Sequence, residues 1–331
     1  MSSVLNISYH TFFCKSESLE MSQDKGRLFF LDGGFSKHAG DTHELNGRIC
    51  SSNPDGSDFK TVVPGIKHMP DGITIDNEKK HIWWTNMGDP EGKHNNGSIH
   101  RCDIDGSNVV TIVPTGATHT PKQCKIAPRS NKLYWCDREG MKVMRSNLDG
   151  SEIEVLYVSG TTQAEKEDPR YHCVGIAVDE RDGKFYWTQK GPPKGGLGRM
   201  FRANVDMASG QSPENRSDVE LLFDGLPEPI DLELDEEHDY LYWTDRGAPP
   251  KGNSVNRISL KSGTGSTNSM QNEILVKNLH ETIGIALDLK NKRMFFGDLE
   301  GSLYEADLDG KNEKVLMKDA GDFTGVAYVE L

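Results

Sequence analysis

Several features that mark other protein classes are missing from this chain of 331 residues. It has no run of 18 apolar residues, and its first 20 residues lack the basic start and continuous apolar stretch of a signal peptide. Basic residues are in deficit: 38 Lys and Arg face 51 Asp and Glu, which gives a formal charge of -13. Such a charge repels phosphate backbones and anionic lipid. We therefore expect a cytoplasmic protein with no nucleic-acid or membrane partner.

Motifs that carry common enzyme chemistry are missing too. The chain contains no HExxH, no GxSxG, no P-loop and no GxGxxG in a βαβ context, so the usual hydrolase, kinase and dinucleotide templates do not apply. The cysteines form no CxxC pair and no cysteine–histidine spacing typical of zinc, and we expect reduced thiols that pack as small apolar groups. They are Cys14, Cys50, Cys102, Cys124, Cys136 and Cys173. No cofactor is expected.

What the sequence does contain is a long repeat. Six aromatic tetrads follow one another along nearly the whole chain: FFLD at 29–32, WWTN at 83–86, YWCD at 134–137, YWTQ at 186–189, YWTD at 242–245 and FFGD at 295–298. Their starts are separated by 54, 51, 52, 56 and 53 residues. This regularity is typical of proteins built from one repeated supersecondary unit.

Each repeat has the pattern of four β-strands. Apolar and polar residues alternate before the tetrad, as in GIAVDERDG, and again in two segments after it, as in GSLYEADLDG and NEKVLMK. Asp-Gly turns and other polar turns separate these segments, and helical periodicity is nearly absent. We therefore predict an all-β fold, a six-bladed β-propeller of four-stranded antiparallel blades.

The two ends of the repeat indicate how the ring closes. The segment FTGVAYVEL at 323–331 resembles an innermost strand with no tetrad after it, and the tetrad at 29–32 has no comparable strand close before it. We expect the C-terminal strand to join blade one, because closure removes open sheet edges. Residues 25–331 would then form a single propeller, and residues 1–24 an N-terminal extension of unassigned position.

Tetrads of the YWTD type, with Leu-Asp-Gly or related turns after them, resemble the six-bladed YWTD propellers of the low-density lipoprotein receptor family, whose units are called class B repeats. The resemblance covers about residues 27–331. The sequence departs from the pattern in FFLD, FFGD and YWTQ and in longer inserts at 206–217 and 261–271. The resemblance implies the propeller fold, while the cysteine-rich modules that flank receptor propellers are not found in this sequence.

Because the tetrad recurs in every unit, we interpret it as scaffold and expect function where the units differ. Two sets of loops should surround one mouth of the central channel: the inner loops, which precede the innermost strands, and the rim loops, which join second to third strands. The rim loops are uneven, and such a lopsided cup suits a small-molecule pocket. They are long at 33–46, 87–96, 190–197 and 246–254 and short at 138–140 and 299–301.

The inner loops concentrate side chains suited to proton transfer and to binding. The catalytic candidates are His119, His172, His280, Asp71 and Glu228. The substrate-binding candidates are polar at Lys122, Gln123, Tyr171 and Arg246 and apolar at Met69, Met87 and Phe323.

As a module-free YWTD propeller of this length, the chain also resembles the hetero-Diels–Alderases of fungal tropolone-sesquiterpenoid biosynthesis. The resemblance implies an enzyme of secondary metabolism that joins a tropolone quinone methide to a macrocyclic sesquiterpene. A cycloaddition needs oriented partners and placed hydrogen bonds rather than a sequence motif. The expected partners are therefore tropolone-type and terpene-type small molecules, and the oligomeric state stays open.

Two other functions stay open. The first is a propeller module that binds a protein or peptide without catalysis, as receptor propellers do. The second is a calcium-dependent, lactonase-like hydrolase, since oxygen ligands suit a hard cation. Its ligands would be Asp71, Glu228, Asp231 and Asp322.

Overall fold

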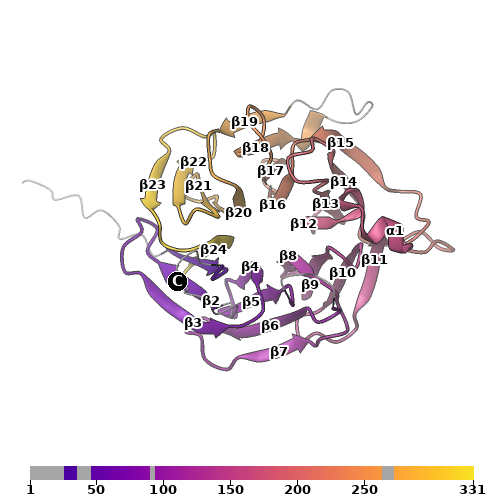
Figure 1. Ribbon diagram of the computed structural model, residues 1–331, viewed down its shortest axis with the longest axis horizontal. Coiled ribbons are helices and arrows are strands. Elements are labelled where there is room, and N and C mark those ends of the chain that lie inside the picture. The colour runs from indigo at the N-terminus through magenta and orange to yellow at the C-terminus, as the bar shows by residue number, and fades with distance from the viewer. Residues whose placement is uncertain (1–25, 36–45, 90–93, 263–271) are drawn as a thin grey trace, which may run out of the picture.

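The computed structural model describes residues 26–35, 46–89, 94–262 and 272–331, and these form six four-stranded antiparallel sheets arranged in a ring (Figure 1). Blade one is β24 (Phe323–Glu330), β1 (Gly26–Asp32), β2 (Gly47–Ser52) and β3 (Lys60–Ile66). Blade two is β4 (Pro70–Asp76), β5 (His81–Asn86), β6 (Ser98–Asp103) and β7 (Val110–Val113). Blade three is β8 (Pro121–Ala127), β9 (Lys132–Asp137), β10 (Lys142–Asn147) and β11 (Glu154–Val158).

The other three blades repeat this order. Blade four is β12 (Cys173–Asp179), β13 (Lys184–Gln189), β14 (Gly198–Asn204) and β15 (Glu220–Leu226). Blade five is β16 (Pro229–Asp235), β17 (Tyr240–Asp245), β18 (Ser254–Ser259) and β19 (Glu273–Val276). Blade six is β20 (Thr282–Asp288), β21 (Arg293–Asp298), β22 (Leu303–Asp307) and β23 (Lys314–Met317). The predicted six-bladed propeller is confirmed.

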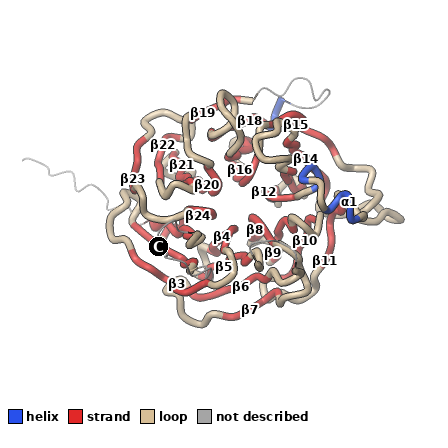
Figure 2. Tube along the Cα trace, viewed as in Figure 1, coloured by secondary structure: helices blue, strands red, loops and turns tan. Residues whose placement is uncertain are grey.

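Helix is confined to short segments in the described residues, as Figure 2 shows. They are α1 (Gln163–Lys166) and two turns of 3₁₀ helix, Pro169–Tyr171 and Leu260–Ser262. None of these helices has both the length and the apolar composition that a membrane-spanning segment requires.

The ring closes where the sequence predicted. Strand β24 pairs antiparallel with β1, with Gly26 opposite Glu330 and Leu28 opposite Tyr328. The last strand of the chain thus supplies the innermost strand of blade one, and Figure 1 shows it beside the first strands. The proposed N-terminal extension, residues 1–24, lies outside the described residues.

The tetrads form the core between neighbouring blades. Trp187 of blade four, for example, packs in one cluster with Tyr134 and Cys136 of blade three. The four tryptophans at the second tetrad position are almost completely buried. Such aromatic side chains supply much of the buried apolar area that holds sheets together. They are Trp84, Trp135, Trp187 and Trp243.

In the three blades whose tetrad contains threonine, this residue connects the blade to the next one. Thr188 Oγ1 accepts a hydrogen bond from Gly175 N at 2.8 Å and donates to Ile230 O of blade five at 2.9 Å. Thr85 and Thr244 do the same in blades two and five. Because buried polar groups need partners, these bonds give the threonine a structural task within the ring, and the interpretation of the tetrad as scaffold is confirmed.

The cysteines are buried and unbridged wherever the structure describes them, at Cys50, Cys102, Cys124, Cys136 and Cys173. Burial raises the pKa of the Cys50, Cys102 and Cys173 thiols to about 12. The prediction of reduced thiols that pack as apolar groups is confirmed for these five residues, and Cys14 lies outside the described residues.

Candidate functional site

The inner loops and rim loops meet on one face of the ring, at the end of the channel that we call the rim mouth. In every blade, the backbone N–H of the residue after the tetrad donates to an inner-loop carbonyl. The six bonds run from Gly33 to Asp322, Met87 to Met69, Arg138 to Thr120, Lys190 to His172, Arg246 to Glu228 and Leu299 to Glu281. The side chains that follow the six tetrads therefore occupy equivalent places around the mouth.

The tetrad carboxylate fixes this junction. In blade three, Asp137 accepts hydrogen bonds from the N–H groups of His119 and Thr120, at 2.7 Å each, and of Gly140 at 3.1 Å. In blade five, Asp245 accepts only from Glu228 N and Gly247 N. Burial raises the pKa of Asp245 to about 7, because two N–H donors do not offset the desolvation of the carboxylate.

Three consecutive blades place a cation directly after the tetrad: Arg138, Lys190 and Arg246. Of these three, only Arg246 was predicted as a site residue. The sequence signal for Arg138 and Lys190 was present, because both occupy the same position after YWCD and YWTQ. It lies in this single position across the repeats and not in the lengths of the loops, on which the prediction depended.

A buried ion pair lies beside these cations. Lys122 Nζ contacts the Asp71 carboxylate and lies 3.2 Å from Met87 Sδ. Gln123 Nε2 donates to the other oxygen of Asp71 at 3.1 Å. Four of the predicted residues are thus brought together, from blades two and three.

Glu228 is the centre of a second group. Its side chain is fully buried, and its Oε1 lies 3.2 Å from Arg246 Nε and 3.5 Å from Lys190 Nζ. Its Oε2 accepts from the backbone N–H of Lys194 at 3.1 Å. Glu281 extends the group, 3.6 Å from Arg246 and 3.2 Å from the Lys194 ammonium.

The cations of the rim mouth are close enough to influence one another. Burial lowers the pKa of Lys122, Asp71 opposes this, and Arg138 and Arg246 lower it further. Burial also lowers the pKa of Lys190, against the effect of Glu228, and Arg246 and Arg138 add to the lowering. Although burial opposes it, Arg138 lowers the pKa of Glu139, whose carboxylate is 2.6 Å from Arg138 Nε. Such a concentration of positive charge favours a ligand with negative or electron-rich oxygens.

Two of the three candidate histidines meet at α1. His172 Nε2 donates to the carbonyl of Lys166 at 2.9 Å, and His119 Nε2 lies 2.8 Å from Lys166 Nζ. Burial lowers the pKa of both imidazoles, so both are neutral at pH 7. His280 lies apart: its side chain is more than half exposed and faces Glu300 at 3.4 Å.

The remaining candidates are spread more widely. Met69 is half-buried in its inner loop. The half-buried Tyr171 ring packs beside Gly160. Phe323 is completely buried and packs edge-on against Phe30, with ring centroids 4.9 Å apart. Its ring is therefore part of the blade-one core rather than a wall that a ligand could contact.

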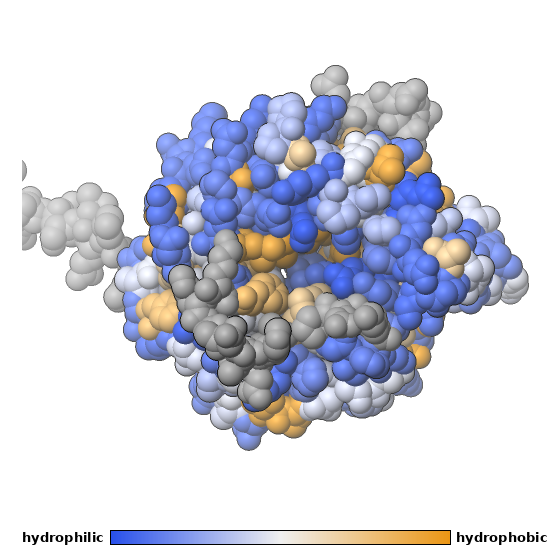
Figure 3. All heavy atoms as spheres, in the orientation of Figure 1, coloured by the Kyte–Doolittle hydropathy of each residue, from blue (hydrophilic) through white to orange (hydrophobic). Residues whose placement is uncertain are grey.

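Three of the four carboxylates predicted as possible calcium ligands form ion pairs with Lys or Arg side chains. Asp71 pairs with Lys122, Glu228 with Lys190 and Arg246, and Asp231 with Lys125 at 3.6 Å. Within the described residues, no three or more His, Cys, Asp and Glu side chains come together as metal ligands would. In the space-filling view down the channel (Figure 3), hydrophilic side chains surround a central hollow, with hydrophobic surface on part of its wall.

Comparisons with known proteins identify relatives over almost the whole chain. Low-density lipoprotein receptor-related protein 1 of Pyricularia oryzae is 48% identical over 316 residues, which cover 93% of this chain and 99% of that protein. The 3-hydroxyacyl-CoA dehydrogenase-like protein LAM1 of Cochliobolus heterostrophus is 36% identical over 324 residues, 96% of this chain and 67% of that protein. No protein-family model matches the sequence.

A solved structure supports the architecture. The propeller in the crystal structure of a nidogen/laminin complex superposes with a TM-score of 0.68, covering 92% of this chain and 98% of that one, at 17% sequence identity. At that identity the likeness shows the fold alone. The near full-length relatives show more: this chain belongs to the family of low-density lipoprotein receptor-related proteins with a YWTD-type six-bladed β-propeller.

Proposed function

We propose that this protein is a small-molecule enzyme of secondary metabolism whose substrates bind at the rim mouth. The candidate reaction is an intermolecular hetero-Diels–Alder addition of a tropolone quinone methide to a macrocyclic sesquiterpene. The observation that carries the proposal is a set of four neighbouring cations that are largely shielded from water: Lys122, Arg138, Lys190 and Arg246. They pair with the carboxylates of Asp71, Glu139 and Glu228.

The cycloaddition requires little covalent chemistry from the protein, and the four cations suit what it does require. Two π bonds are replaced by one carbon–carbon and one carbon–oxygen σ bond, no atom is lost, and negative charge grows on the tropolone oxygens in the transition state. Preorganised cations next to those oxygens stabilise that charge, and more strongly in a partly dry site than in water. Holding both partners in one pocket supplies the rest of the acceleration.

The quinone methide would form from a hydroxymethyl precursor by loss of water. A base accepts the proton of the ring hydroxyl, the carbon–oxygen bond of the hydroxymethyl group breaks, and an acid protonates the departing hydroxide, so that no net proton is consumed. A neutral imidazole can serve as such a base near pH 7. His172 is the candidate, because its Nε2 proton is fixed on the Lys166 carbonyl and Nδ1 is then the basic atom.

The first experiment measures binding with tropolone itself as probe. We expect millimolar tropolone to raise the melting temperature of the wild type, because a ligand that binds only the folded state stabilises it. Arg246→Met should lose most of this shift, whereas Lys251→Met, an exposed cation of the same rim loop, should keep it. No shift in the wild type, or an equal shift in both variants, would contradict a cationic tropolone site.

The second experiment measures reaction. Incubation of the protein with a hydroxymethyl tropolone and humulene should give the adduct faster than the spontaneous reaction, as measured by mass spectrometry. His172→Ala should slow it by about 100-fold if the imidazole is the base, and should leave addition to a preformed quinone methide nearly unchanged. If tropolone binds and no variant or wild type accelerates adduct formation, the propeller is a binding module.

A further inference from the structure

A cavity lies at the end of the channel opposite the rim mouth, and we call this end the second mouth. Its volume is about 750 Å³, and its wall includes Pro128, Arg181 and Glu236, from the turns that follow the innermost strands. An adjoining cavity of about 380 Å³ shares Lys125, Ile126 and Glu233 with it. Cavities of this size suit a small organic ligand.

The residues at the floor of this mouth differ between the blades at two positions of the innermost strand. In four blades the innermost strand carries glycine, at Gly72, Gly175, Gly284 and Gly325, where a Cβ would strike the backbone of the next blade. Two residues further on, these strands carry the small side chains of Thr74, Ala177, Ala286 and Ala327. Blades three and five instead have Gln123 with Lys125 and Asp231 with Glu233.

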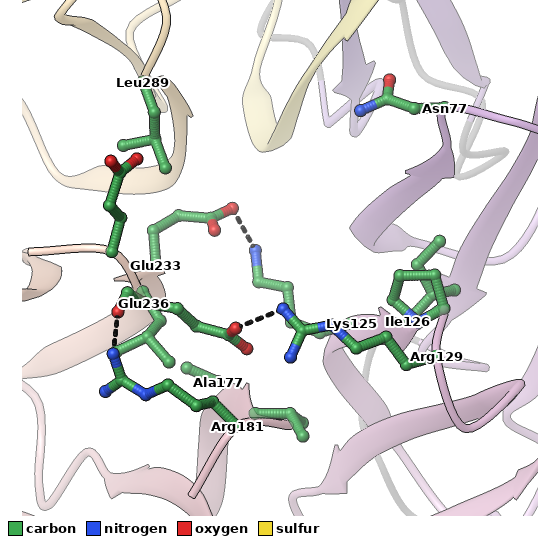
Figure 4. Close-up of a pocket in the computed structure, with 13 residues that line it drawn as sticks. Asn77, Lys125, Ile126, Arg129, Ala177, Arg181, Glu233, Glu236 and Leu289 are labelled. Atoms are coloured by element: carbon green, nitrogen blue, oxygen red, sulfur yellow. Dashed lines mark hydrogen bonds and ion pairs between the residues drawn. The ribbon is translucent and has the colours of Figure 1, made fainter. Parts of the chain in front are cut away.

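These substitutions place a charged triplet across the channel. Lys125 Nζ lies 2.7 Å from Glu233 Oε1 and 3.6 Å from Asp231 Oδ1, and Figure 4 shows the Lys125–Glu233 contact at the centre of the cavity. Asp231 is 1% exposed and also accepts from Leu232 N and Ile285 N. One ammonium thus faces two carboxyl groups, and of these Glu233 is the one that lies next to the cavity.

The wall of the two cavities carries more carboxylates than cations. The two cavities are lined by three cations and five carboxylates. Each cation already has a carboxylate partner: Glu233 for Lys125, Glu236 for Arg129 at 2.7 Å, and Asp239 for Arg181. Among the described residues, no cation lies within ion-pair distance of Glu237 or Glu78.

We propose that the second mouth binds a small organic cation, an amine with an apolar body. Its ammonium group would contact Glu233 and Glu237, and its apolar part would lie on Ile126, Leu234 and Leu289, which line the same cavity. An anion is disfavoured because all three cations of the wall are already neutralised. This site is independent of the rim mouth, from which the triplet separates it.

The test is isothermal titration calorimetry with 2-phenylethylamine, with 2-phenylethanol and phenylacetate as probes of the same shape and different charge. We expect the amine to bind with a Kd in the millimolar range or below and the other two at least about tenfold more weakly. Glu237→Gln, at an exposed residue outside the triplet, should weaken amine binding by about threefold or more. Glu233→Gln should weaken it by about tenfold.

Two controls keep the outcome clear. Glu152→Gln removes an exposed carboxylate that lines neither cavity and should leave amine binding unchanged. Arg246→Met should also leave it unchanged, so that failure of the rim-mouth proposal is distinguishable from failure of this one. Equal binding of the amine and the alcohol, no amine binding at about 10 mM, or full amine binding in both Glu233→Gln and Glu237→Gln would overturn the proposal.

Discussion

The two mouths of the channel differ in charge although the same strands build both. At the rim mouth, five cations face four carboxylates, and the cations come from the residue after the tetrad, from an inner strand and, at Lys194, from a rim loop. At the second mouth, five carboxylates face three cations. The two mouths therefore differ in the sign of their net charge, and the Lys125 triplet lies between them. The difference shows that a symmetric scaffold gains chemistry only where single repeats break the pattern.

The largest effect should come from breaking the triplet that separates the mouths. Lys125→Ala leaves Asp231 and Glu233 without their ammonium, and loss of one partner of a buried pair costs about 3 kcal/mol or more. Urea unfolding should show this loss in the free energy of unfolding.

The matched variant restores the pattern of the other blades. Lys125→Ala combined with Asp231→Gly and Glu233→Ala removes all three charges together, and we expect it to be more stable than Lys125→Ala alone by about 2 kcal/mol. A triple variant that is less stable than the single one would show that the small side chains of the other blades cannot replace the triplet in blades three and five.

The next effect is at the rim mouth, where Lys122 and Asp71 form a comparable buried pair. Lys122→Met should lower the free energy of unfolding by about 2–3 kcal/mol, because it leaves the Asp71 carboxylate unpaired. Lys122→Met with Asp71→Asn should recover part of this loss. Equal stability of the single and double variants would mean that the two side chains are not coupled.

The pH dependence of stability tests the buried carboxyl groups of the channel. Burial raises the pKa of Asp231 to about 7, while Lys125 lowers it and Glu233 raises it again. The folded state therefore binds the proton more tightly than the unfolded state, and stability is lost as the pH rises from about 4 through 7. We expect a decline of a few kcal/mol in the wild type across this range, since each pKa unit corresponds to about 1.4 kcal/mol.

Asp231→Asn should reduce this decline, and Asp245→Asn should do so at the rim mouth, since burial raises the pKa of that carboxyl to about 7 as well. Chemical denaturation at several pH values measures both. An unchanged pH profile in Asp231→Asn would assign the decline to other groups.

The smallest effect should come from the outer pair of the rim mouth. Glu281 is about one third exposed and lies 3.6 Å from Arg246, so Glu281→Gln should change the free energy of unfolding by no more than about 0.5 kcal/mol. The same variant should bind tropolone more tightly, because it removes a carboxylate that competes for Arg246. Weaker binding would show that Glu281 orients the guanidinium instead.

Much of the fold could be predicted from residues that recur at the same position in each repeat. The tetrads at a spacing of 51 to 56 residues specify the blades, and the unpaired strand at 323–331 predicts the closure that the β24–β1 pairing confirms. The short helix α1 was not predicted, because four residues leave no periodicity to detect. Its Lys166 nevertheless contacts both His119 and His172.

The sequence by itself determined the six-fold scaffold and the face on which its loops gather, because strand periodicity and turn chemistry are local properties that recur. Only the tertiary structure decided which side chains share a site. Lys125 and Glu233 are 108 residues apart along the chain and 2.7 Å apart across the channel. Phe323 enters a blade core while Arg138 and Lys190 reach the mouth. Such contacts depend on how neighbouring blades pack and on which charged side chains are buried together. No local sequence pattern encodes either of these.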